Sequence, residues 1–254
     1  MQKNVTRPRT NVGTLYGINA IKEALGARLL DYVLVAEGQH NPRVQEIIDT
    51  CRRLGIPLRF APPAALERAA GTAQHQNVVA FCPAKSYEEV ESLLHPEGDS
   101  LLVVLDGVQD PRNLGAVVRA AVGAGAYGLI IPERRSAGLS PVVAKAAAGA
   151  LEHLKVARVK NLVRTLVDLK KANIWICGFE SKAAKSYLEI DYTQPCALVF
   201  GGEGEGLHRL VREACDYLAH IPLRGPVESL NVSIAAAVVL YEAVRQRTPV
   251  QGQA

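Results

Sequence analysis

The chain has 254 residues, of which 48% are hydrophobic and 21% are charged, and its formal net charge is +4 at neutral pH. This length and apolar content suit one or two globular domains and argue against a disordered or fibrous protein. No apolar run approaches the ~20 residues that cross a bilayer, so a membrane protein is not expected.

The first residues, 1–12, are polar and basic, with Lys3, Arg7 and Arg9 but no acid, and we predict a flexible basic tail there. No apolar stretch follows it, so a secretory signal is not expected. Two roles stay open for the tail: none, or electrostatic contact with RNA phosphates.

Residues 13–84 alternate between helix and strand patterns, which predicts a small α/β sandwich. The predicted helices are 19–25, 42–54 and 64–70, and the predicted strands are 31–36, 57–60 and 77–82. Residues 85–99 are rich in acidic and turn-forming residues, and we predict a linker there.

Residues 100–254 again alternate, now with nearly continuous apolar strands, and such strands predict a parallel sheet covered by helices on both faces. The predicted strands are 101–105, 128–131, 174–179, 196–200 and 218–221, and the predicted helices are 113–123, 141–149, 161–171, 208–214 and 232–247.

The five cysteines lie far apart, without metal-binding spacing, which favours a reducing, cytoplasmic compartment and no metal site. Cys82, Cys177 and Cys196 lie in apolar runs and are expected to be buried.

Three segments carry the functional information. The first contains Asn113, Gly115 and Arg119, the second reads GGEGEGL over 201–207, and the third reads SLNVS over 229–233. Taken alone, the third segment is an ordinary helix start in which Ser229 or Ser233 could be the N-cap. Together and in this order, the three resemble the motifs of the SpoU (TrmH-type) family of RNA ribose 2′-O-methyltransferases, which use S-adenosylmethionine.

The resemblance extends from about residue 99 to residue 247, and no motif position departs from the family pattern. It implies a deep trefoil knot in the C-terminal domain, which periodicity alone does not indicate, and a homodimer formed through that domain. The stretches LYGINAIKEAL and HQNVVA also resemble an N-terminal RNA-binding domain of the ribosomal protein L30e type found in part of the family.

The resemblance further implies methyl transfer to a guanosine in the peptidyl-transferase P loop of 23S rRNA. Alternatives are a relative acting on tRNA or on another rRNA site, and a non-catalytic RNA-binding factor for ribosome assembly. An oxidoreductase is disfavoured because no dinucleotide-binding G-x-G-x-x-G follows a strand.

For the cofactor, the resemblance assigns Gly201, Ile221 and Leu230 to a pocket with largely main-chain contacts. The glycines at 201–206 would let the backbone approach a ligand closely, although a tight turn needs them equally.

The resemblance assigns the reaction to five side chains: Arg119, Asn113, Glu203, Ser229 and Asn231. Because a guanidinium stays protonated, orienting an RNA phosphate is a more physical role for the arginine than proton abstraction. The residue types alone leave simpler roles open. These are an ion pair for the arginine, helix capping for the asparagines and serine, and a solvated turn for the glutamate. Arg134 and Arg135 follow a predicted strand and either contact RNA phosphates or lie in a solvated loop.

Overall fold

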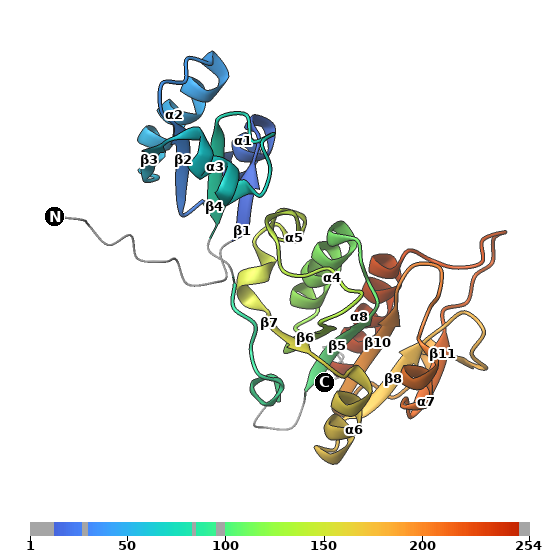
Figure 1. Cartoon of the computed structure of the whole chain (residues 1–254). Helices are drawn as coiled ribbons and strands as arrows, with labels where there is room; N and C mark the ends of the chain where they lie inside the picture. The colour runs from blue at the N-terminus through green and yellow to red at the C-terminus, as the bar shows by residue number, and fades with distance from the viewer. Residues whose placement is uncertain (1–12, 27–29, 83–84, 95–99, 249–254) are drawn as a thin grey trace, which may run out of the picture. The chain divides into compact units, whose positions relative to one another are not determined.

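The computed structural model describes residues 13–26, 30–82, 85–94 and 100–248, so the predicted tail over 1–12 lies outside the described residues. Two compact units make up the chain, one up to Ser86 together with Leu139–Pro141, and one comprising the rest from Tyr87. Each unit has its own sheet (Figure 1).

The first unit contains a four-stranded sheet in the order β1-β4-β2-β3, in which β4 runs antiparallel to both neighbours and β2 runs parallel to β3. Its elements are β1 (Gly13–Tyr16), α1 (Ile18–Gly26), β2 (Tyr32–Ala36), α2 (Pro42–Leu54), β3 (Leu58–Ala61), α3 (Pro63–Ala70) and β4 (Val78–Cys82). Alternate strand residues, such as Val33 and Val35, pack against α1 and α2 in one buried cluster. The predicted elements are present, and the structure adds β1, whose four residues are too short for a periodic pattern.

The second unit contains a seven-stranded sheet in the order β7-β6-β5-β10-β8-β11-β9, and every strand pair in it is parallel. Its strands are β5 (Leu101–Asp106), β6 (Gly128–Pro132), β7 (Lys155–Val159), β8 (Trp175–Phe179), β9 (Lys185–Ser186), β10 (Cys196–Gly201) and β11 (Tyr217–His220). Its α-helices are α4 (Pro111–Gly123), α5 (Pro141–Ala147), α6 (Leu162–Lys171), α7 (Arg209–Glu213) and α8 (Val232–Arg247). The parallel sheet predicted from the apolar runs is confirmed.

Helices cover both faces of this sheet, as its doubly apolar strands require. Leu102 and Val104 of β5 belong to the buried cluster that also contains α6 and α7 residues. The residues between them point to the opposite face, where α4 and α8 pack against each other (Figure 1). Because these strands are parallel, the loops after β5, β6, β8 and β10 all lie at the same end of the sheet, where the strands end.

Two strands, β7 and β9, are absent from the elements predicted from the sequence. The β7 sequence KVARV mixes charged and apolar residues at the edge of the sheet, so it lacks the apolar run that marks the central strands. Part of the predicted linker also packs into the second unit. There, Val90–Leu93 forms a short 3₁₀ helix, and Leu93 is fully buried beside Gly128.

Cys177 and Cys196 are buried as expected, whereas the burial of the Cys82 side chain is outside the described residues. Burial raises the pKa of Cys51 and of Cys196 to about 11, so both thiols are protonated at neutral pH. Among the described helices, none is both long and apolar enough to cross a membrane.

Candidate functional site

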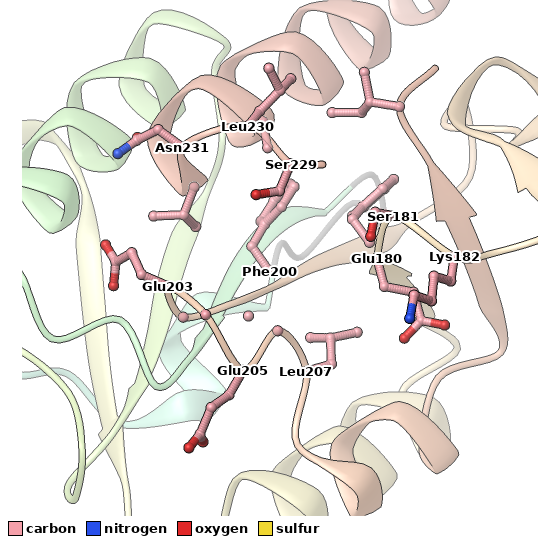
Figure 2. Close-up of a pocket in the computed structure, with 18 of the residues that line it drawn as sticks. Glu180, Ser181, Lys182, Phe200, Glu203, Glu205, Leu207, Ser229, Leu230 and Asn231 are labelled. Carbon is pink, nitrogen blue, oxygen red and sulfur yellow. The ribbon is translucent and has the colours of Figure 1, made fainter. Parts of the chain in front are cut away.

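A cavity of about 650 Å³ opens at the carboxyl ends of β8 and β10. Ligand sites in open parallel sheets characteristically form at this edge. All three residues predicted to bind the cofactor, Gly201, Ile221 and Leu230, line the cavity. Figure 2 shows Glu203 and Asn231 on one side of it and the segment Glu180–Lys182 on the opposite side.

The glycine loop, Gly201–Leu207, forms the floor of this cavity. It closes on itself so tightly that a Cβ on Gly201 would lie 2.0 Å from the carbonyl carbon of Gly206. Gly206 itself has a φ of +67°, a conformation that other residues rarely adopt. Glycine is therefore required at 201 by the close backbone approach and at 206 by the left-handed turn.

Three predicted catalytic side chains from different segments form one hydrogen-bonded chain. The Asn231 amide nitrogen donates to Asn113 Oδ1 at 3.1 Å, and the Asn113 amide nitrogen donates to Glu203 Oε1. Asn113 is 90 residues from Glu203 and 118 from Asn231 in sequence, so the fold alone brings the three together. In each asparagine the side-chain amide nitrogen donates a hydrogen bond and the amide oxygen accepts one, and this fixes the orientation of the side chain.

The helix caps differ in part from the sequence interpretation. Asn113 does not cap α4, because the helix begins two residues earlier and Asp110 accepts a hydrogen bond from the Arg112 amide. Neither Ser229 nor Ser233 caps α8, since Asn231 does so by accepting from the Ser233 amide at 2.9 Å. Asn231 thus combines a capping role with its bond to Asn113.

Ser229 lies on the segment that enters α8, with its side chain at the wall of the cavity (Figure 2). It is exposed, and its hydroxyl makes no hydrogen bond to any described residue. Ser229 therefore keeps a free donor and acceptor for a ligand.

Arg119 does not join the other four predicted catalytic residues. It lies on α4 six residues after Asn113, which places the two side chains about 120° apart around the helix at 3.6 residues per turn. Arg119 instead lines a separate hollow of about 750 Å³ with Ala150, His153 and Tyr241. It is exposed, and no carboxylate in the described ranges pairs with it.

Asp106 and His208 form a pair that was not among the predicted site residues. Asp106, which is 5% exposed, accepts hydrogen bonds from the His208 amide at 2.8 Å and from His208 Nδ1 at 2.9 Å. Its carbonyl oxygen accepts from the Gly202 amide at 2.8 Å. Asp106 therefore holds the glycine loop at both ends. The sequence does contain a signal for Asp106, which is an acid at the end of an apolar strand. A carboxylate buried there needs hydrogen-bond donors.

We expect Asp106→Ala to weaken cofactor binding at least tenfold and to lower the free energy of unfolding by about 1–3 kcal/mol, because it leaves the part-buried His208 amide without its acceptor. Asp106→Asn retains an oxygen acceptor for that amide and should keep most of the affinity. Calorimetry with S-adenosylmethionine and denaturant titration measure the two effects. Unchanged cofactor affinity in Asp106→Ala would show that the loop keeps its shape without this carboxylate.

Within the described part of the chain, no group of three or more histidine, cysteine, aspartate or glutamate side chains is arranged to hold a metal ion. The arrangement that the structure does provide is a glycine-floored cavity beside a fixed amide and carboxylate chain. Such a site can bind an extended polar ligand and orient a second reactant next to it.

Known proteins show the same organisation. Residues 100–241 match the model of the SpoU rRNA Methylase family, and residues 14–88 match that of the RNA 2′-O ribose methyltransferase substrate-binding domain. The 23S rRNA (guanosine-2′-O-)-methyltransferase RlmB of Xylella fastidiosa strain 9a5c is 45% identical over 92% of this chain and 96% of its own. The protein of the same description from Haemophilus influenzae is 42% identical over 92% and 97%.

Among solved structures, the SpoU methyltransferase AviRb of Streptomyces viridochromogenes in complex with the cofactor AdoMet superposes with a TM-score of 0.65. It is 27% identical in sequence, and the match covers 96% of this chain and 94% of that one. With a family model that spans more than half of its residues and relatives above 40% identity over nearly all of them, the chain belongs to the SpoU rRNA methylase family.

Proposed function

We propose that this protein transfers a methyl group from S-adenosylmethionine to the ribose 2′-hydroxyl of a guanosine in 23S rRNA, in the peptidyl-transferase P loop. The observation that carries the proposal is the hydrogen-bonded chain of Asn231, Asn113 and Glu203 beside the glycine-floored cavity. The names of the RlmB relatives support the choice of substrate.

The cavity fits S-adenosylmethionine in size and chemistry. Its volume of about 650 Å³ lies within the range of small-molecule sites. The four glycines between 201 and 206 lack side chains, so a ligand can approach their backbone closely. Ile221, Leu223 and Leu230 supply apolar contacts. Gly201, Ile221 and Leu230 would hold the cofactor largely through main-chain groups, with Ser229 offering its free hydroxyl. Bound there, S-adenosylmethionine supplies an already activated methyl group.

The protein's own task is then to orient the ribose and its phosphate. Glu203 fixes the Asn113 amide, and Asn231 fixes its oxygen, so that this part of the site is rigid before RNA arrives. Such preorganisation can account for a large part of a rate enhancement. Arg119 is suited to hold the RNA phosphate by two parallel hydrogen bonds, because its guanidinium is exposed and unpaired among the described residues.

We further propose that the second unit carries the trefoil knot of the family and that catalysis resides in residues 100–254. Residues 13–84 would then be an L30e-like domain that binds the rRNA, joined through 85–99. The match of 14–88 to the substrate-binding model supports this division. An rRNA substrate supports a cytoplasmic location. Mapping of 2′-O-methyl groups on rRNA and tRNA from cells with and without the protein tests the substrate, and loss of a tRNA methyl group instead would overturn it.

A homodimer formed through the second unit would complete the site. Glu203 and Asn231, the partners of Asn113, line the cofactor cavity, whereas Arg119 lines another hollow, so a partner copy could supply the arginine. The surface around Arg119 supports such docking. Ile234 and Tyr241, seven residues apart on α8, are 53% and 55% exposed.

We expect the double variant Ile234→Glu, Tyr241→Glu to be monomeric and to lose methylation while it still binds S-adenosylmethionine. Buried charges would oppose association, whereas both side chains are exposed within one chain. Light scattering should give twice 27.3 kDa for the parent and 27.3 kDa for the variant. Val167→Glu, at another exposed apolar position on α6, should stay dimeric. An active monomeric parent would contradict the proposal.

A further inference from the structure

A hollow of about 400 Å³ lies at the carboxyl ends of the strands, as the cofactor cavity does. It is distinct from the hollow at Arg119 and is called the second hollow because it is the second one at this end of the strands. It is formed where β5 and β6 end and where α6 and α7 begin. Its lining contains several apolar residues, namely Pro132, Val163, Leu210 and Val211. Leu210 is 53% exposed, so part of this apolar lining faces solvent. The surface is therefore apolar and open to a ligand from solvent.

Three arginines contribute to the same hollow: Arg134, Arg135 and Arg209. Arg209 is partly neutralised, because its Nη1 lies 2.7 Å from Glu213 Oε1. Arg134 and Arg135 are exposed, and neither pairs with a carboxylate anywhere in the described ranges. The hollow thus combines apolar residues with two guanidinium groups that pair with no described carboxylate, and the paired Asp106 and His208 also line it.

The loop that carries these two arginines is held in a defined shape. The Glu133 amide donates to Val159 O and the Ala137 amide donates to Val108 O, each at 2.8 Å. Arg135 has a φ of +55°, a left-handed conformation that costs a non-glycine residue energy. Strained backbone of this kind is concentrated at functional sites. The loop therefore presents the arginines at a fixed place instead of merely connecting β6 to α5.

This hollow adjoins the proposed reaction site. Residues 201–207 line the cofactor cavity, and the next four residues, 208–211, line the second hollow. The Asp106–His208 pair belongs to the wall of the second hollow and also holds the glycine loop. If the target ribose lies at Asn113, as proposed, this hollow is placed to receive a neighbouring nucleotide of the same RNA.

We propose that the second hollow is a subsite for one unpaired nucleotide next to the methylated one. Its base would lie on the apolar floor at Pro132 and Leu210, while Arg134 and Arg135 bind the phosphates on either side of it. Unpaired bases are recognised by such stacking surfaces flanked by arginine, and phosphates are bound by charge. The inference rests on the proposed function, since it takes the RNA to be the substrate.

The test measures binding of a 23S rRNA fragment that contains the P loop, at several salt concentrations, for the full chain and two variants. Arg134→Gln, Arg135→Gln removes both guanidinium groups, and Lys171→Gln removes one exposed charge at the far end of α6. For single-stranded RNA, each phosphate contact contributes about 0.7 to the slope of log K against log salt. We expect the double variant to lower that slope by about 1.4 and the control to leave it unchanged.

A second arm tests the base. Abasic sites replace single bases of the fragment, and at one position beside the target guanosine this should weaken binding to the parent. Leu210→Ser should bind the intact fragment and that abasic fragment equally. An unchanged salt slope in the double variant, an equal loss in Lys171→Gln, or no sensitive abasic position would overturn the subsite. Methylation by the parent is scored separately. If the parent methylates the fragment but the double variant keeps the parent's salt slope, only the subsite is refuted. If binding depends on the two arginines but the parent does not methylate the fragment, only the proposed function is refuted.

Discussion

Arg119→Lys should lose about a hundredfold or more of the single-turnover methylation rate while the fold and the affinity for S-adenosylmethionine stay as in the parent. Lysine keeps the positive charge but lacks the planar fork that can hold a phosphate at two points. Losses of this size are typical when a group that organises the reacting atoms is removed. The side chain is exposed and lines a hollow other than the cofactor cavity, so we expect neither stability nor cofactor binding to depend on it.

Melting temperature and rate should be measured on the same preparation, under single-turnover conditions so that RNA release does not mask the reaction step. Arg112→Lys is a matched control, since Arg112 is also exposed at the start of α4 but lies outside the family motif. A rate for Arg119→Lys within about threefold of the parent, or a loss explained by unfolding, would remove Arg119 from the catalytic assignment.

Gly201→Ala should abolish measurable cofactor binding at concentrations that saturate the parent. The added Cβ would lie 2.0 Å from the Gly206 carbonyl carbon and 2.5 Å from the Leu207 nitrogen, and backbone atoms cannot move aside as a flexible side chain can. The loop must therefore open, which deforms the floor of the cavity and displaces Glu203 from Asn113.

Gly225→Ala provides the matched control, because an added Cβ there meets no atom within 4 Å and the residue does not have a positive φ. Calorimetry on both variants, with circular dichroism to confirm folding, compares the two substitutions. A folded Gly201→Ala protein that binds the cofactor as the parent does would show that the closed loop is not needed for the pocket.

Much of the fold could be predicted because the central strands are apolar on both sides. LLVVL at 101–105 and CALVF at 196–200 are fully buried in the middle of the sheet, and their composition alone marks them. The edge strand β7 was missed for the opposite reason, since Lys155 and Arg158 interrupt its apolar pattern. Pairing of β4 with β1 and β2 in antiparallel order depends on contacts across the first unit that no local pattern contains.

The site was predictable only in part. Asn113, Glu203 and Asn231 are distant in sequence, and the resemblance to a family, not spacing or composition, put them together. The separation of Arg119 from Asn113 follows from helix geometry and could have been anticipated. The pairing of Asp106 with His208 could not, because the partner of a buried acid 102 residues away is decided by the fold.

Methyl transfer from S-adenosylmethionine to a ribose of 23S rRNA can be measured directly. The direct test incubates the purified full chain with a P-loop fragment of 23S rRNA or with tRNA, in the presence of a chelator, and locates the methyl group by mass spectrometry of nuclease digests. We expect one 2′-O-methylguanosine in the 23S fragment, formed only with S-adenosylmethionine, and none in tRNA. Methylation of tRNA alone, methylation on a base, or no methyl transfer to the 23S fragment would contradict the account.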